Sequence, residues 1–447
     1  MGSTLEPYRL TATEVISAIK NGSLTVEEYA KSLLSRIEQR DPVVKAWAYL
    51  DPELVLKRAR ELDQIPPEQR GPLHGVAVGV KDVIYTKDMP TQHNSPIYTS
   101  HHPQLDAGCV SILRFAGALI LGKTTTTQFA ATVTGPPTTN PHDPARTPGG
   151  SSSGSGAAVG DFQVPLALGT QTGGSTIRPG SFNGVYAFKP TWGAVSREGL
   201  KIYSLMLDTL GLYARAVGDL EVVSEVLGIR DDDEGMGQRK GVGKMKFALL
   251  KNGRDVFPEP GKGTRDAMDK AVKLLKEAGA SVEEVTFDWP EWKRMPEWHR
   301  CVMLTDGGTA FLPEYSAHKD KLDAFLVGHV ENKGRFTHKA RLEALDGIAA
   351  LRPKVDAVLA GYDALLTPSV LDEAPLGIES TGSAAFNGVW TALHVPVVNV
   401  PGFQGENRLP VGVSLVAPRY RDRHLLEVSD EVGKIFEAKG GWTRKNV

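Results

Sequence analysis

Short runs of apolar residues alternate with helix-periodic segments along the first half of the chain. This pattern predicts strands at 76–80, 118–121 and, more weakly, 164–170, with helices at 106–116 and 154–160. Because the strands are continuously apolar, both of their sides are expected to be buried. Such strands are typical of a sheet covered by helices on both faces. The pattern therefore predicts an α/β fold.

The flanking regions extend this pattern. Thr11 with Glu14, and Thr25 with Glu28, fit the capping box and predict two helices near the N-terminus. A charged, glycine-rich stretch at 231–244 predicts a solvated loop between lobes. Beyond it the pattern predicts strands at 246–250, 281–287, 363–368, 395–401 and 409–417, and helices at 264–278, over most of 304–360, and at 423–438.

Composition narrows the class of protein. Among 447 residues, 51 Lys and Arg nearly balance 53 Asp and Glu, without a long basic block, which argues against a nucleic-acid partner. With only two cysteines, Cys109 and Cys301, a reducing compartment is favoured over a disulfide framework. No signal peptide and no membrane-spanning apolar run is evident. We therefore expect a cytoplasmic protein with no membrane partner.

Two Gly-Gly-Ser turns are the clearest candidates for chemistry. They end at Ser151 and Ser175, 24 positions apart, and Lys81 lies upstream at the end of an apolar run. Glycine permits backbone conformations, including positive φ, in which N–H groups converge on a ligand. A buried lysine can lose its proton, because desolvation disfavours the ammonium form. These features predict a serine nucleophile with a lysine base, requiring neither histidine nor a metal.

Three other patterns compete with this interpretation. The run from Gly117 to Thr124 matches the phosphate-binding P-loop expression, but its intervening residues are Ala-Leu-Ile-Leu, which indicate a strand rather than a loop. The run from Gly150 to Gly154 matches the nucleophile elbow and would make Ser152 the nucleophile, but a proline-rich loop precedes it instead of a strand. The histidines His93, His101 and His102 lack metal-ligand spacing. No metal and no cofactor is expected.

The ordered motifs resemble those of the amidase signature family. They are the segments Gly75–Asp82, Arg146–Ser152 and Gly169–Ser175, supported by Lys189–Gly193, Leu207–Gly211 and Leu409–Val413. The resemblance is dense over residues 70–220, thin through 230–360, and returns near the end. It implies one α/β/α domain over 1–447, with a large mixed sheet covered by helices on both faces. It also implies a catalytic core at 70–220 and a variable substrate-pocket region at 230–390.

The resemblance also assigns roles to residues. It implies that Ser175 is the nucleophile, that Ser151 is a bridging serine held in a cis peptide, and that Lys81 is the base. The oxyanion hole would be formed by the backbone N–H groups of Thr172, Gly173, Gly174 and Ser175.

Residues around these turns are expected to support them. We expect Arg178 and Asp208 to fix the loops of the site by ion pairing, and Ser152 to add a hydrogen bond. Two positions depart from the family pattern: Ser153 replaces a usual glycine, and Gln171 replaces an aspartate found in many members. The glutamine is a variant associated with stand-alone amidases rather than with the glutaminyl-tRNA amidotransferase subunit.

The implied reaction is hydrolysis of the C–N bond of a small, largely apolar amide, aryl amides included, through an acyl-enzyme. The expectation of an apolar substrate rests on large side chains in the poorly matched region: Trp292, Trp298, Met303, Phe311, Phe325, Phe386 and Trp390. A carbamate or ester hydrolase with the same site, and a glutamine amidotransferase A-type subunit, remain alternatives. A catalytically silent scaffold is disfavoured. The expected partner is a small-molecule amide, and a homodimer is left open.

Overall fold

A mixed sheet of 11 strands forms the centre of the computed structural model, which describes residues 6–231 and 240–443. The strand order is β1-β3-β2-β4-β6-β5-β10-β11-β9-β7-β8. Strand β2 pairs in parallel with β3 and β4, and β7 pairs in parallel with β8 and β9, whereas the central strands pair antiparallel. The predicted α/β class with a large mixed sheet is confirmed.

The strands are β1 (Trp47–Tyr49), β2 (Ala77–Lys81), β3 (Leu119–Thr124), β4 (Leu166–Gln171), β5 (Tyr186–Lys189), β6 (Thr209–Ala214), β7 (Lys246–Leu250), β8 (Ser281–Val285), β9 (Ala364–Pro368), β10 (Val397–Gln404) and β11 (Pro410–Val416). The α-helices are α1 (Ala12–Lys20), α2 (Val26–Val44), α3 (Pro52–Asp63), α4 (Gly108–Phe115), α5 (Ser153–Gly160), α6 (Ile177–Phe182), α7 (Val217–Val226), α8 (Lys262–Glu277), α9 (Met295–Ala310), α10 (Leu312–His318), α11 (Ala324–Val330), α12 (His338–Leu359), α13 (Gly388–Ala392) and α14 (Asp422–Lys439).

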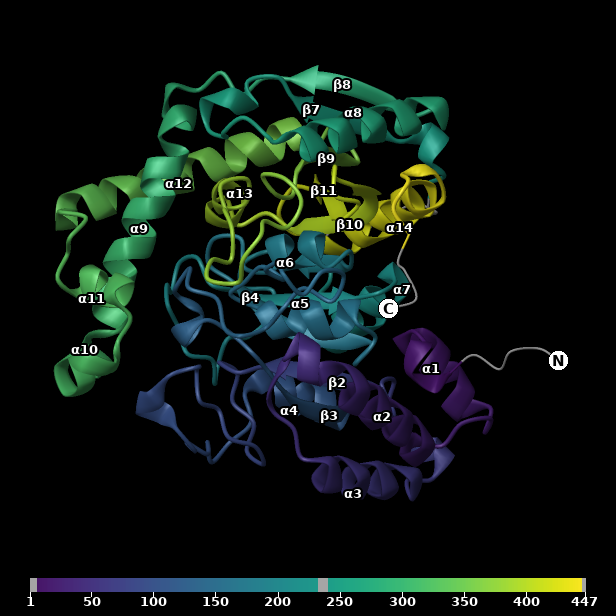
Figure 1. Ribbon diagram of the computed structural model, residues 1–447. Helices are drawn as coiled ribbons and strands as arrows, with labels where there is room; N and C mark the ends of the chain where they lie inside the picture. The colour runs from purple at the N-terminus through teal and green to yellow at the C-terminus, as the bar shows by residue number, and fades with distance from the viewer. Residues whose placement is uncertain (1–5, 232–239, 444–447) are drawn as a thin grey trace.

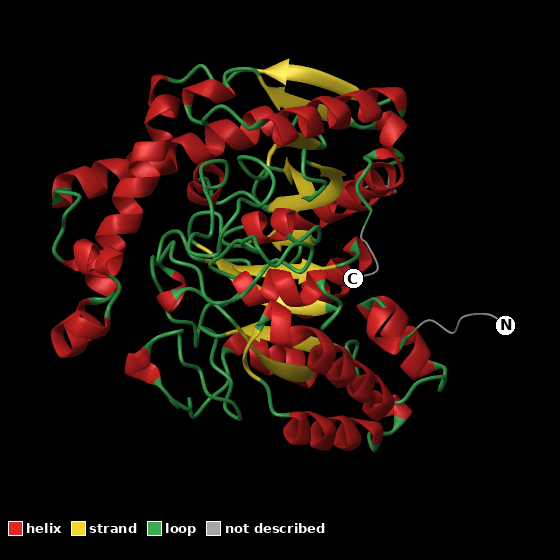
Figure 2. Ribbon diagram, viewed as in Figure 1, coloured by secondary structure: helices red, strands yellow, loops and turns green. Residues whose placement is uncertain are grey.

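Helices surround the sheet, and one group of helices projects from it. The strands form a column through the middle of the molecule, with α5 and α6 packed against its central strands (Figures 1 and 2). Helices α9 and α12 pack on each other and, with α10 and α11, form an arm at the left of Figure 1. Loops gather between this arm and the strands (Figure 2).

Local sequence signals account for several of these elements. Both capping boxes are present: the Thr11 and Thr25 side chains each accept a hydrogen bond from the N–H three residues later. Every residue of β2 and of β3 is buried, which explains why both strands are continuously apolar up to their lysines. Lys123 lies within β3, so the P-loop-like run is part of a strand and offers no phosphate-binding loop.

Some elements have no clear signal in the sequence. Helix α3 and the strands β1, β5 and β6 carry no predicted counterpart; β6 is fully buried but is interrupted by Gly211. At Gly211 an added Cβ would collide with the Thr176 side chain, so the glycine is needed for close packing rather than for a turn. Most of the loop predicted at 231–244 lies outside the described residues, and 242–244 form a short 3₁₀ helix.

Candidate active site

Lys81 is the last residue of β2, and its side chain is completely buried. Its Nζ donates hydrogen bonds to Ser151 Oγ at 2.8 Å and to Thr170 Oγ1 at 2.6 Å. Burial lowers the pKa of Lys81 well below its ordinary value; Asp208 partly opposes this shift, and the nearby Arg178 cation adds to it. The environment therefore favours a neutral amine that can accept a proton from the serine it touches.

Ser151 lies in the turn before α5. The Gly150–Ser151 peptide bond is cis, in agreement with the expectation from the family, and Gly149 has a φ of 81°. A side chain at Gly150 would crowd Thr381, whose Cγ2 lies 2.5 Å from the position of an added Cβ. Ser153, which replaces the usual glycine, donates its hydroxyl to the Gly149 carbonyl at 2.8 Å. This substitution therefore closes the turn rather than disrupting it.

Ser175 ends the turn that joins β4 to α6. Because β4 lies parallel to β2 and beside it, the two strands end at the same edge of the sheet, and this brings the turn toward Lys81. Ser175 is 9% exposed, the most accessible of the three proposed catalytic residues, since Ser151 is 2% and Lys81 0% exposed. Its carbonyl accepts a hydrogen bond from the Tyr213 hydroxyl at 3.0 Å, which anchors the end of the turn.

The carbonyls of the 172–175 turn are held by side chains from distant segments. His299 on α9 donates from Nε2 to the Thr172 carbonyl at 2.9 Å, and Thr391 on α13 donates to the Gly173 carbonyl at 2.8 Å. These bonds fix the orientation of the peptide units that contain the proposed oxyanion-hole N–H groups. Neither residue was found from the sequence, because nothing in the local pattern around either position links it to the turn.

Gln171 shows why the replacement of aspartate is tolerated. Its Oε1 accepts hydrogen bonds from the backbone N–H groups of Thr176 at 2.8 Å and Ile177 at 3.1 Å, as a carboxylate oxygen could. Its Nε2 donates to the hydroxyl of Thr391 at 3.0 Å, which a carboxylate could not do. The amide therefore ties the start of α6 to the same threonine that holds Gly173.

Arg178 and Asp208 do fix loops of the site, but with hydrogen bonds instead of the expected ion pairs. Arg178 donates to the Gly150 carbonyl at 2.5 Å and to the Gly382 carbonyl at 2.8 Å, and burial lowers its pKa to about 10. Asp208 accepts from Thr172 Oγ1 at 2.6 Å, and burial raises its pKa to about 6. Among the described residues, neither side chain lies in an ion pair, so the expectation of ion pairing is wrong.

Ser152 is fully buried and bonded to a strand. Its Oγ lies 3.2 Å from both the carbonyl and the N–H of Thr170, donating to the first and accepting from the second. Both hydrogen-bonding capacities of the hydroxyl are thus used on the backbone of β4. This arrangement agrees with the supporting hydrogen bond expected of Ser152 and disfavours the nucleophile-elbow interpretation.

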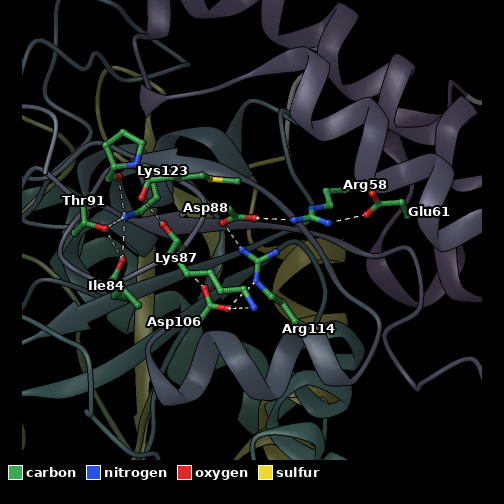
Figure 3. Close-up of polar contacts among 12 residues, drawn as sticks. Arg58, Glu61, Ile84, Lys87, Asp88, Thr91, Asp106, Arg114 and Lys123 are labelled. Carbon is green, nitrogen blue, oxygen red and sulfur yellow. Dashed lines mark hydrogen bonds and ion pairs between the residues drawn. The ribbon is translucent and has the colours of Figure 1, made fainter. Parts of the chain in front are cut away.

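A second buried lysine, Lys123, holds the loop that follows Lys81. Its Nζ donates to the Ile84 carbonyl at 2.9 Å and to Thr91 Oγ1 at 2.5 Å (Figure 3). It also lies 3.4 Å from the Asp82 carboxylate. Further along this loop, Asp88 pairs with Arg114 of α4 at 2.5 Å (Figure 3). The Asp82 carboxylate therefore pairs with Lys123 and accepts from the Gln92 N–H.

The predicted pocket aromatics are mostly core. Trp292, Trp390 and Phe386 pack together with the Phe257 ring in one buried cluster that also contains Trp298, and Phe311 is buried in another. The large side chains of region 290–390 thus mostly form a hydrophobic core, shared by α9, α12, α13 and one side of the sheet, rather than an open pocket. A cavity of about 710 Å³ does lie nearby, between the segment 200–205 and the start of α12, but different residues line it.

The histidines and cysteines noted in the sequence lie in packed surroundings. His93 and His101 lie in an aromatic cluster with Tyr98, and within the described ranges no three His, Cys, Asp or Glu side chains are grouped so as to hold a metal ion. Cys109 and Cys301 are buried and unbonded. Among the helices of residues 6–231 and 240–443, none has the length and apolar character needed to cross a membrane.

This chain is similar to known proteins over most of its length. The Amidase family model matches residues 28–426. The A subunit of the glutamyl-tRNA(Gln) amidotransferase of Carboxydothermus hydrogenoformans is 30% identical over 95% of this chain and 97% of its own length. The protein of the same name from Acidothermus cellulolyticus is 38% identical over 62% of this chain and 58% of its own length.

Solved structures extend the comparison. A crystal structure of an amidase has a TM-score of 0.85 at 28% identity and covers 97% of this chain and 100% of its own. A peptide amidase in complex with the competitive inhibitor chymostatin has a TM-score of 0.80 at 27% identity, with 96% and 98% covered. The family match, the full-length relatives and the shared fold show that this chain belongs to the Amidase family, the amidase signature enzymes, and is an enzyme of the amidohydrolase type, which acts on carbon–nitrogen bonds.

Proposed function

We propose that this chain hydrolyses a small, largely apolar amide through an acyl-enzyme, with Ser175 as the nucleophile. The observation that carries the proposal is the contact of 2.8 Å between the buried Lys81 Nζ and Ser151 Oγ. A serine hydroxyl is a weak nucleophile until a neighbouring base accepts its proton. A lysine whose pKa is lowered by burial can be that base at neutral pH.

In the proposed reaction, the proton of Ser175 moves toward Lys81 and later reaches the leaving amine. Ser175 Oγ attacks the amide carbonyl while its proton passes to Ser151, whose own proton passes to Lys81. The backbone N–H groups of residues 172–175 hold the oxyanion. When the C–N bond breaks, the proton returns by the same route to the leaving amine. Water then attacks the acyl group and releases the acid and free Ser175.

We assign the whole chain to one domain, with residues 70–220 as the catalytic core and 230–390 as the region that shapes the substrate pocket. Two free, buried cysteines favour a cytoplasmic location. Carbamates and esters place the same carbonyl before the oxyanion hole, so hydrolysis of these compounds is an accompanying activity. The names of the full-length relatives support a second candidate, the A-type subunit of an amidotransferase.

The test labels the nucleophile directly. A fluorophosphonate probe reacts with wild-type enzyme, and peptide mapping places the adduct on Ser175. Ser175→Ala abolishes labelling and lowers kcat/KM for a simple amide by about 10³-fold or more, because the acyl-enzyme no longer forms. Ser111→Ala, which changes a half-buried serine of α4, is the matched control and labels normally. An adduct on Ser152, or full labelling of Ser175→Ala, contradicts the assignment.

A further inference from the structure

Gln171 is the last residue of β4, and its side-chain amide is buried between the start of α6 and helix α13. Its Oε1 accepts hydrogen bonds from the backbone N–H groups of Thr176 and Ile177. Because a backbone N–H can only donate, the oxygen of the amide must face these two groups, and the NH₂ group must face Thr391. The partners of this amide therefore fix its orientation.

The Thr391 hydroxyl on α13 has one proton to donate. Gln171 Nε2 donates to Thr391 Oγ1 at 3.0 Å, so the hydroxyl proton must point to another acceptor. Two carbonyls are within reach, that of Gly173 at 2.8 Å and that of Asn387 at 3.2 Å. The Asn387 carbonyl already accepts the Thr391 N–H at 3.0 Å, whereas the Gly173 carbonyl is closer. The hydroxyl proton therefore goes to the Gly173 carbonyl.

The Gly173 carbonyl and the Gly174 N–H belong to one planar peptide unit. Among residues 6–231 and 240–443 the only cis peptide bond is Gly150–Ser151, so the carbonyl and the N–H of this unit point in opposite directions. A donor that holds the carbonyl therefore also fixes the N–H, and it strengthens the N–H as a donor by polarising the unit. Within the described part of the chain the Gly174 N–H has no protein acceptor, so it can bind an oxyanion.

A carboxylate at position 171 would reverse the hydrogen bond to Thr391. It offers only acceptor oxygens, and a charged acceptor competes more strongly for a hydroxyl proton than a neutral carbonyl does. Thr391 would then donate to the carboxylate, and the Gly173 carbonyl would lose its donor. His299 holds the preceding peptide unit separately, so the change would act on the Gly174 N–H.

We propose that Gln171 and Thr391 are positioning residues of the oxyanion hole. The amide directs the hydroxyl proton to the Gly173 carbonyl, and this bond aims the N–H of the next residue at the oxyanion. The inference rests on the proposed function of Ser175. A bond that matters only when the substrate oxygen carries negative charge affects kcat, and its loss leaves KM nearly unchanged.

The first experiment removes the Thr391 hydroxyl or keeps it. Thr391→Val has a similar shape and is expected to lower kcat by about 10-fold or more for both propanamide and 4-phenylbutanamide, with KM within about threefold. Thr391→Ser retains the hydroxyl and is expected to restore most of kcat. Thr305→Val on α9 is the matched control and keeps wild-type kcat, because the Thr305 hydroxyl donates to the Cys301 and Val302 carbonyls of its own helix.

A second variant tests the direction of the hydrogen bond. Gln171→Glu keeps the size of the side chain and an oxygen for the start of α6, but the donor that faces Thr391 becomes an acceptor. It is expected to lower kcat by about 10-fold. In the Thr391→Val background the same change should cause no more than about a threefold further loss, because Gln171 acts through the hydroxyl.

Binding of a transition-state analogue reports on the oxyanion directly. In 1,1,1-trifluoro-2-butanone, the ketone that corresponds to propanamide, the carbonyl carbon forms a bond to Ser175 Oγ. The C=O π electrons move to the oxygen, which becomes the oxyanion, while the serine proton passes through Ser151 to Lys81. The inhibition constant is expected to rise in Thr391→Val by about the factor by which kcat/KM falls.

The outcomes separate this inference from the proposed function. Wild-type values of kcat and of the inhibition constant in Thr391→Val overturn the inference, and so do fully additive losses in the double variant or a loss with one amide alone. In these cases turnover that still depends on Ser175 leaves the proposed function standing. Turnover that survives in Ser175→Ala contradicts the proposed function itself.

Discussion

Lys81 illustrates how a residue acquires chemistry from its position. On a surface it would be an ammonium ion with a pKa of about 10.4. As the last residue of a buried strand it keeps its hydrogen bonds to two hydroxyls but loses the surrounding water that stabilises its charge. Since burial penalises only the charged form, the pKa falls, and the amine becomes available as a base.

The first residue-scale prediction concerns pH. Activity is expected to fall as the pH drops through the lowered pKa of Lys81, because protonation fills the lone pair that accepts the serine proton. In a plot of kcat/KM against pH, the midpoint of this rise therefore lies below the ordinary lysine pKa of about 10.4. Lys81→Ala lowers kcat/KM by about 10²–10⁴-fold and removes this limb of the pH profile. Lys87→Ala, which changes an exposed lysine nearby, retains both. An unchanged limb in Lys81→Ala would contradict the role of this lysine.

The second prediction concerns Gly173 and Gly174, which differ in how much space a side chain would have. An added Cβ at Gly174 would collide with the Asn387 side chain, whereas at Gly173 it would meet only Ala384 and His299 at 3.7 and 3.8 Å. We expect Gly174→Ala to lower kcat/KM by about 10²-fold, since the turn must shift away from the oxyanion position. Gly173→Ala should lower kcat/KM clearly less than Gly174→Ala does. Equal losses in the two variants would indicate that the clash does not decide the turn geometry.

At the scale of elements, the loop after β2 depends on the buried lysine of β3. Lys123 donates hydrogen bonds to three acceptors, the Ile84 and Pro90 carbonyls and the Thr91 hydroxyl, and pairs with the Asp82 carboxylate, while burial lowers the pKa of Lys123 to about 8. Its removal would leave a buried carboxylate without its cation. Such a change is costly because the remaining charge has no water around it.

We therefore predict that Lys123→Met lowers the free energy of unfolding by about 3–5 kcal/mol. Denaturant titration followed by circular dichroism measures this quantity. The matched control is Lys339→Met, whose exposed side chain pairs with Glu343 on the same helix face and which is expected to change stability little. A loss below about 1 kcal/mol in Lys123→Met would show that the network is dispensable.

At the scale of the whole molecule, the site is assembled from segments far apart in sequence. The turn at 172–175 is held by His299, Thr391 and Asp208, and the turn at 149–151 by Arg178 with the 381–382 loop behind it. All of these groups come from one chain. The side chains that hold the two turns therefore belong to several distant segments of the same chain.

The origin of these groups in one chain leads to the last prediction. The purified chain alone should hydrolyse propanamide and 4-phenylbutanamide, because every group proposed for the reaction is its own. Glutamine should be a poorer substrate, since its charged amino and carboxylate groups do not suit a site for a small, largely apolar amide. The measurement is kcat/KM for each compound without added proteins. A preference for glutamine, or activity only with partner proteins, would favour the amidotransferase alternative.

The sequence by itself determined the local features. Capping boxes, apolar strands and Gly-Gly-Ser turns depend on residues close together in the chain, so their pattern predicted α1, α2, β2 and both serine turns. The order of these motifs was also enough to indicate the family, because the resemblance rests on the residues of the motifs and not on their positions in space.

Only the tertiary structure decided what surrounds the site. His299 and Thr391 are ordinary helical residues in the sequence, and only the packing of α9 and α13 brings them to the turn. Hydrophobicity likewise could not separate core from pocket: Trp292 and Trp390 became core, whereas Tyr203 and Phe336 line the cavity. The physical reason is that apolar composition records removal from water, and it is the same whether neighbouring side chains fill the space or leave it for a ligand.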